Sequence, residues 1–155
     1  KFLIFNEQKE SFYKANAFGY NLARSISDFQ ISKNINTKKI STLYSHRSKY
    51  WSDPLNNTFN LGNDYNPLFL MQQGSKTLVN SKFYNLLKDK EIKLMVIKVS
   101  SVNDVSIIKP FFKKECSVEF VYKEIPYESR NFLTVGIKKY FFVYFSNDDL
   151  NSCLK

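Results

Sequence analysis

Hydrophobic and polar positions follow a helical period in the middle of the chain, and capping residues mark where each helix begins. Asn66-Pro67 provides an N-cap followed by a first-turn proline, and Gly74 stands where a left-handed turn would end the helix. A second helix then carries an apolar stripe flanked by lysines. The stripe comprises Leu78, Val79, Phe83, Leu86 and Leu87, and the lysines are Lys76, Lys82 and Lys88.

After residue 105 the period shortens to two, which predicts a β-hairpin. The preceding segment, 92–105, is ambiguous, because its apolar residues fit either a helix or a buried strand. In 108–113, and again in 118–123, every second residue can face the body while lysines face away. The hairpin turn falls at 114–117, and Pro126 ends the second strand because proline cannot donate to a ladder.

The last segments are predicted to be helical. Ser129 caps a long helix whose inward stripe contains Phe132, Leu133, Ile137, Tyr140, Phe141 and Tyr144. Its cations Arg130, Lys138 and Lys139 then face outward. Asn147-Asp148-Asp149 starts another helix that the chain barely enters, with the acids favourably placed at its N-terminus.

These elements predict a mainly α fold: a helical domain at 61–155 with a protruding β-hairpin, preceded by an N-terminal extension at 1–60. The best amphipathic series of the extension is Phe12, Ala15, Phe18, Leu22 and Ile26. The tract 33–49 contains lysine, arginine and histidine but no acid. It fits a solvated linker and an RNA-threading arm equally well.

Charge and composition restrict the class of partner. The chain has 155 residues, 43% of them hydrophobic, and a net charge of +9. It is therefore apolar enough to fold, and its charge favours a polyanion such as nucleic acid. Its longest apolar run, 140–145, is far shorter than the roughly 20 residues of a membrane helix, so we expect no membrane insertion.

No residue pattern predicts catalysis, a cofactor or a metal site. His46 is the single histidine and has no carboxylate or cysteine at catalytic or ligand spacing. Two cysteines cannot build a disulfide framework, which favours a reducing compartment with Cys116 as a small turn residue. The aromatics Phe111, Phe112, Phe120 and Tyr122 could stack on bases, but core packing is favoured.

The order of these elements resembles the ribosomal protein seven family of the small subunit, in its divergent mitochondrial form. The resemblance covers about residues 67–146. It rests on Leu70-Met71-x-x-Gly74-x-Lys76 leading to Tyr84 and Leu87, on Ile108-Lys109-Pro110, on Pro126, and on Arg130-x-x-Leu133 leading to Ile137-Lys138 and Tyr140. The C-terminal helices of the family have no counterpart after Asn147, so the domain is expected to be C-terminally truncated.

The resemblance implies a structural, non-enzymatic constituent of the small mitochondrial ribosomal subunit, located in the matrix. Such a protein binds rRNA in the subunit head, beside neighbouring ribosomal proteins and near the exit-site tRNA and the mRNA. The expected RNA-binding residues are Lys76, Lys82, Lys109, Lys113, Lys114, Lys123, Arg130, Lys138 and Lys139. An accessory subunit of a respiratory membrane complex is the alternative, since it too would be small, aromatic and basic.

Overall fold

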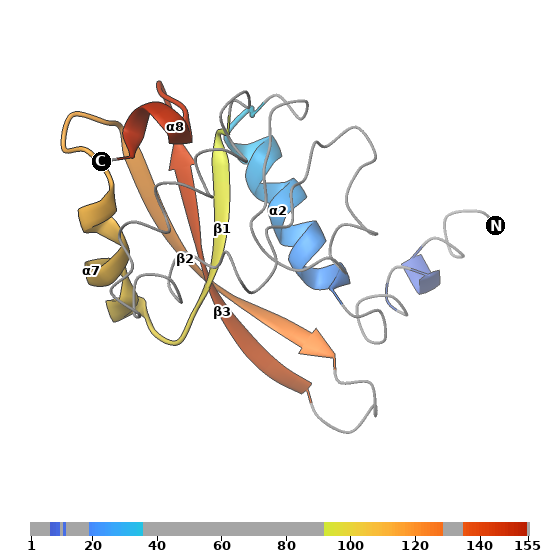
Figure 1. The fold of residues 1–155 in the computed structure, drawn as a ribbon. Coiled ribbons are helices and arrows are strands. Elements are labelled where there is room, and N and C mark those ends of the chain that lie inside the picture. The colour runs from blue at the N-terminus through green and yellow to red at the C-terminus, as the bar shows by residue number, and fades with distance from the viewer. Residues whose placement is uncertain (1–6, 10, 12–18, 36–91, 129–134, 155) are drawn as a thin grey trace.

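The computed structural model describes residues 7–9, 11, 19–35, 92–128 and 135–154. Within these ranges three antiparallel strands form one sheet in the order β1-β3-β2 (Figure 1). The strands are β1 (Leu94–Val99), β2 (Val118–Glu128) and β3 (Val135–Phe145). β3 pairs with β2 along its whole length but with β1 only from Lys139 onward. The first part of β3 and the end of β2 therefore extend beyond β1 as a two-stranded ribbon.

Helix α2 (Tyr20–Ser32) covers one face of the sheet (Figure 1). Its buried residues Leu22, Ile26 and Phe29 recur at helical spacing and form one stripe. The stripe packs on a set of sheet residues: Leu94, Val96, Ile125, Tyr140 and Phe142. The predicted amphipathic series is thus confirmed at Leu22 and Ile26, and its other members lie outside the described residues.

Short helices cover the opposite face. They are the 3-10 helix η4 (Val102–Asp104), α7 (Val105–Ile108), the 3-10 helix η5 (Lys109–Phe111) and α8 (Leu150–Cys153). The core on this side contains Ile92, Met95, Ile97, Val99, Ile108, Phe112, Phe141, Val143, Phe145, Leu150, Cys153 and Leu154. The sheet is therefore buried on both faces. Among the described residues, no helix is long and apolar enough to cross a membrane.

The prediction of a mainly α fold is wrong, because the described residues form a sheet with helices on its two faces. The segment predicted as the final helix contains β3 instead. Apolar residues at 140–145 mimic helical spacing because both faces of this central strand are covered, which makes the run continuous. Its even residues, such as Phe142, face α2, and its odd residues, such as Phe141, face the other core.

The predicted hairpin at 108–123 is also wrong. Residues 105–111 are helical, and β2 pairs with β3 rather than with the segment before it. Ile108 and Phe112 are both buried four positions apart, with Val105 packed beside them, which is the spacing of a helical face. Six positions in which lysine alternates with apolar residues are too few to distinguish the period of a strand from that of a helix.

Other expectations have mixed outcomes. The ambiguous segment 92–105 contains strand β1 and then the helical turns of η4 and α7. Pro126 does not end β2, which continues to Glu128, because β2 is an edge strand whose outer side needs no donor. The helix after Asn147 is confirmed: Asp149 caps α8 by accepting a hydrogen bond from Ser152 N at 2.8 Å. The expectations for Gly74, Ser129 and the helices at 66–88 lie outside the described residues.

Candidate anion-binding pocket

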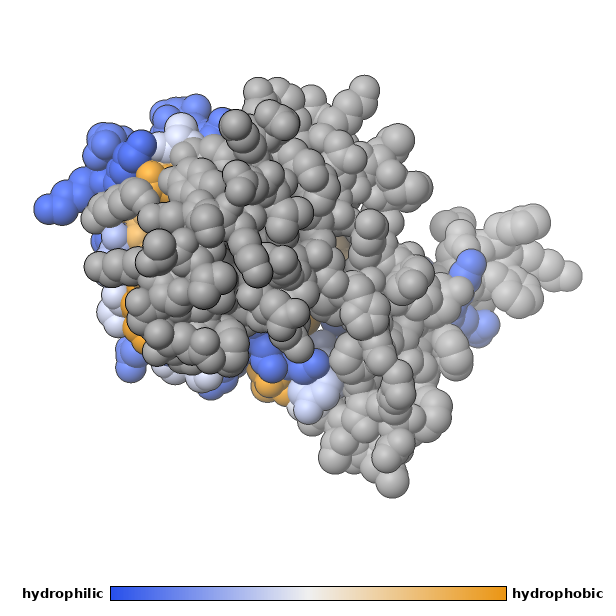
Figure 2. All heavy atoms as spheres, in the orientation of Figure 1, coloured by the Kyte–Doolittle hydropathy of each residue, from blue (hydrophilic) through white to orange (hydrophobic). Residues whose placement is uncertain are grey.

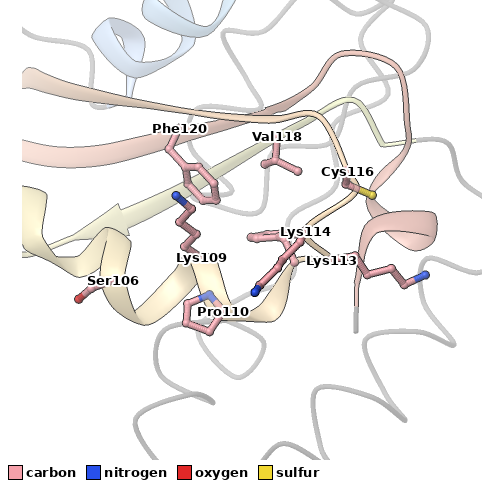
Figure 3. Close-up of a pocket in the computed structure, with 9 residues that line it drawn as sticks. Ser106, Lys109, Pro110, Lys113, Lys114, Cys116, Val118 and Phe120 are labelled. Carbon is pink, nitrogen blue, oxygen red and sulfur yellow. The ribbon is translucent and has the colours of Figure 1, made fainter.

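A pocket of about 400 Å³ opens between η5, the loop before β2, and β2 itself (Figure 3). It is lined by Ser106, Lys109, Pro110, Phe112, Lys113, Lys114, Cys116, Val118 and Phe120. Its walls are mainly apolar, whereas three of its residues are lysines. Three of the predicted RNA-binding residues therefore converge on one site, although on helical and loop backbone rather than on a hairpin.

Local sequence explains how the first wall is positioned. Ser101 and Asp104 form a capping box: the Ser101 side chain accepts from Asn103 N, and the Asp104 carboxylate accepts from Ser101 N at 3.3 Å. The same carboxylate also accepts from Ser100 N at 2.7 Å. The chain therefore turns directly from β1 into η4 and α7. Burial of Ile108 and Phe112 then holds the intervening Lys109 and its neighbours at the surface.

The second wall comes from β2 by strand alternation. Val118 and Phe120 face the same side of the sheet as Phe141, because Phe120 pairs with Val143 and Tyr122 with Phe141. The Phe120 ring meets Phe112 edge-on at 5.7 Å. The preference for core packing is confirmed for Phe112, which is buried, and Phe120 is partly buried against the same core.

A disulfide fixes the third wall. Cys116 is bonded to Cys153 of α8, so the expectation that Cys116 is only a small turn residue is wrong. Backbone hydrogen bonds also hold the same loop. Lys113 N donates to Cys153 O at 2.8 Å, and Phe112 forms an isolated antiparallel β-bridge with Leu154. The loop that carries Lys113 and Lys114 is therefore held to the C-terminal helix at several points.

The three lysines are not equivalent. Lys113 Nζ donates to Ser152 O at 2.7 Å and points toward α8, away from the other two (Figure 3). The exposed Lys109 side chain ends beside the Phe120 ring, and that of Lys114 ends near Pro110 (Figure 3). The described lining residues include no carboxylate. Lys109 and Lys114 can therefore attract an anion, and Lys113 mainly holds the loop.

The described lining provides groups that can bind a ligand. Ser106 is the hydroxyl residue of the lining, and it donates to Asn103 O at 2.8 Å. The described lining contains neither a carboxylate nor a histidine that could activate it as a nucleophile. Apolar walls with cations at the rim match a molecule that has one anionic and one flat or apolar part.

The remaining predicted RNA-binding residues lie elsewhere. Lys123, Lys138 and Lys139 are on the paired strands β2 and β3, away from the pocket lining. Lys138 Nζ lies over the Tyr127 ring at 4.4 Å from its centroid, and Lys139 pairs with Glu124 across the sheet. Lys76, Lys82 and Arg130 lie outside the described residues.

The distribution of charge changes the electrostatic picture. The described residues include 11 of the 23 Lys and Arg but 9 of the 14 Asp and Glu, so most of the excess charge belongs to the other segments. Within the described part, hydrophilic and hydrophobic residues lie side by side at the edge where α7 and the loop before β2 are found (Figure 2). Local clustering at the pocket, rather than net charge, makes this region a candidate anion site.

Sequence reasoning missed the apolar half of the site. Pro110, Val118 and Cys116 line the pocket but were interpreted only as hairpin and turn residues. The spacing of Val105, Ile108 and Phe112 could have revealed the helical turns. Nothing in the sequence paired Cys116 with Cys153, which are 37 residues apart.

No protein-family model, curated protein or solved structure matches this chain.

Proposed function

We propose that this protein is a non-enzymatic RNA-binding protein that holds single-stranded RNA at the pocket beside the Cys116–Cys153 disulfide. The observation that carries the proposal is the placement of Lys109 and Lys114 at the rim of an aromatic-lined pocket without a carboxylate in its described lining. Phosphate would meet the two ammonium groups, and an unpaired base would enter against Phe120. RNA recognition commonly combines backbone cations with aromatic stacking of splayed bases.

The expected energies are modest for each group. Stacking a base on an aromatic side chain contributes about 1–3 kcal/mol, and each lysine-phosphate contact releases counterions. Loss of one such contact lowers the slope of log affinity against log salt by about 0.7 for single-stranded RNA. The salt slope therefore separates loss of a phosphate contact from general damage to the fold.

The test measures binding of a short, fluorescently labelled single-stranded RNA by anisotropy over a range of salt. Lys109→Glu should weaken binding and flatten the salt dependence, and Lys114→Glu should do the same. Lys98→Glu is the matched control, because Lys98 is an exposed lysine on β1 outside the pocket lining and the change in charge is the same. Equal losses for Lys98→Glu and Lys109→Glu would assign binding to overall charge and refute the pocket.

We further propose that the RNA is rRNA of the small mitochondrial ribosomal subunit. Support comes from the sequence resemblance to the ribosomal protein seven family, whose motif Ile108-Lys109-Pro110 includes one of the pocket lysines. The fold contributes no support, since the sheet differs from the mainly helical domain that the resemblance implied. Sedimentation of the tagged protein with small ribosomal subunits in a sucrose gradient tests this finer statement.

One observation favours the alternative of an accessory subunit of a respiratory membrane complex. Disulfides persist in oxidising compartments and are rare where thiol reductants are abundant, and Cys116 is bonded to Cys153. Such a subunit would face an oxidising side of its membrane. Copurification with a membrane complex after nuclease treatment, without sedimentation with ribosomal subunits, would select this alternative and reject the ribosomal assignment.

A further inference from the structure

The surroundings of the disulfide contain a third metal-binding group. One carboxylate oxygen of Asp148 and the sulfur atoms of Cys116 and Cys153 all lie within 4.8 Å of one another. Cys153 is buried, and the other two residues are half-buried. Reduction of the disulfide would leave two thiols and a carboxylate close together, which are three potential metal ligands.

The two cysteines would remain neighbours without their bond, because the backbone holds both segments. Lys113 N donates to Cys153 O at 2.8 Å, Val118 N to Cys116 O at 3.1 Å, and Leu154 N to Leu150 O at 3.2 Å. Asp148 is held as well. Its carboxylate accepts from Ser117 N at 3.3 Å, and its backbone oxygen accepts from Lys93 Nζ at 2.6 Å.

The spacing fits a tetrahedral ion with sulfur and oxygen ligands. Zn–S bonds of about 2.3 Å at tetrahedral angles place two sulfurs about 3.8 Å apart. The Cα atoms of the cysteines are 5.7 Å apart, so a change in side-chain torsions would supply this separation without moving the backbone. Thiolates favour Zn²⁺ over Mg²⁺ or Ca²⁺, and the Ser117 N–H would orient the carboxylate ligand.

Local charge is compatible with the ion. Two thiolates and a carboxylate carry three negative charges, which Zn²⁺ reduces to one. Lys93 and Lys113 donate to backbone oxygens of Asp148 and Ser152, so both cations lie near this remaining charge. A tetrahedral ion with three protein ligands keeps its fourth position for water or for a molecule in the adjoining pocket, whose lining includes Cys116.

We propose that the reduced protein binds one Zn²⁺ ion through Cys116, Cys153 and Asp148, and that a peroxide releases the ion by oxidising the two thiolates to the disulfide. In that step hydrogen peroxide takes up the two electrons and two protons and becomes two water molecules, and Zn²⁺ leaves with its charge unchanged. A phosphine reductant and one water convert the disulfide into two thiols and a phosphine oxide. Each thiol then loses its proton to solvent as its sulfur binds the ion. The site is thus a metal centre under reducing conditions and a covalent cross-link under oxidising ones.

The test titrates the full chain with Co²⁺, in the absence of oxygen, before and after treatment with a phosphine. Reduced protein should bind one equivalent, with the thiolate charge-transfer band and visible bands of a tetrahedral ion, and Zn²⁺ should displace it. Competition with a chromophoric chelator then gives the Zn²⁺ affinity of each variant. Asp148→Asn should weaken this affinity at least tenfold, and Cys116→Ala should abolish the charge-transfer signal of the two-sulfur site.

Glu115→Gln is the matched control, because Glu115 is an exposed carboxylate next to Cys116 in the chain but outside the donor group. Its affinity should equal that of the original protein. A rise in the melting temperature of the reduced, unsubstituted protein on adding Zn²⁺ tests the same site without any variant. Absence of stoichiometric Co²⁺ binding after reduction would overturn the proposal, as would full affinity in Asp148→Asn or retention of the spectrum in Cys116→Ala.

Discussion

The ring of Tyr127 lies across Gly136, its partner on the neighbouring strand. A Cβ atom added to Gly136 would come within 2.6 Å of Tyr127 Cζ and 2.7 Å of its hydroxyl oxygen. Lys138 Nζ also lies over the Tyr127 ring, 4.4 Å from the ring centroid. Glycine therefore gives the ribbon of β2 and β3 a surface on which an aromatic side chain can rest, as aromatic residues commonly do opposite strand glycines.

A double-mutant cycle tests this contact. Gly136→Ala should lower the free energy of unfolding by about 1 kcal/mol, because the ring must swing away from its position over the strand and Lys138. In a Tyr127→Ala background the same change should raise the free energy of unfolding by about 0.4–1 kcal/mol, since alanine restricts the unfolded chain. Urea unfolding of the four proteins gives both values. An identical effect of Gly136→Ala in the two backgrounds would show that the ring and the glycine are independent.

Two isoleucines distinguish the observed sheet from the predicted helix. Ile97 is 2% exposed on β1, whereas Ile137 on β3 is 59% exposed although the helical interpretation turned it inward. Ile97→Ala should cost about 2–5 kcal/mol of unfolding free energy, as expected for a buried methyl-rich side chain. Ile137→Ala should cost less than about 0.5 kcal/mol. Similar large losses at both positions, measured by urea unfolding, would favour burial of Ile137 and contradict the sheet.

The sequence was informative where local rules suffice. Asp149 belongs to the segment that was predicted to start a helix, and the structure confirms that helix. Lys109, Lys113 and Lys114 line one pocket, and their binding to RNA stays a prediction. Strand β3 was not recognisable, because a strand covered on both faces has no alternation, and its aromatics at 140, 141 and 144 also fit a helix. The spacing of apolar residues therefore does not distinguish a strand that is buried on both faces from a helix.

Long-range pairing was the second obstacle. β3, which follows β2 in the chain, lies between β2 and β1, and this order brings the C-terminal helix against the loop before β2. Pairing of Cys116 with Cys153, and the presence of Asp148 beside them, depends on that topology. No local pattern encodes it, so both the disulfide and the proposed metal site were invisible before the fold was known.

Tyr122 gives the fold a pH dependence at the alkaline end. Partial burial raises the pKa of its hydroxyl group, and the hydrogen bond to Glu124 at 2.9 Å and the negative charges of Glu124 and Asp104 raise it further. The unfolded chain loses this proton near the ordinary value of 10.0, while the folded chain keeps it to higher pH. Stability from this group is therefore complete below pH 10.0 and is lost as pH rises through the folded pKa.

The measurement is tyrosinate absorbance, read as the difference between the original protein and Tyr122→Phe because the chain contains 10 tyrosines. The difference curve should titrate above the ordinary pKa. Glu124→Gln should move the curve toward lower pH, since it removes a charge that opposes the phenolate. A difference curve centred at or below the ordinary value would contradict the assigned environment of Tyr122.

Reduction of the disulfide should destabilise the protein by about 3–4 kcal/mol when metal ions are chelated. The bond joins residues 37 positions apart, and cross-linking a loop of this length removes conformational entropy from the unfolded chain by about that amount at 25 °C. Unfolding by urea, with and without a phosphine and with a chelator present throughout, measures the difference. Cys116→Ala/Cys153→Ala is the control, and its stability should not respond to the reductant. Because backbone bonds such as Lys113 N to Cys153 O do not depend on the sulfur atoms, we expect the reduced protein to keep its native circular dichroism below the unfolding transition. Loss of that signal on reduction alone would show that the cross-link, and not the backbone, positions α8 against the pocket loop, and that the reduced cysteines are not preorganised.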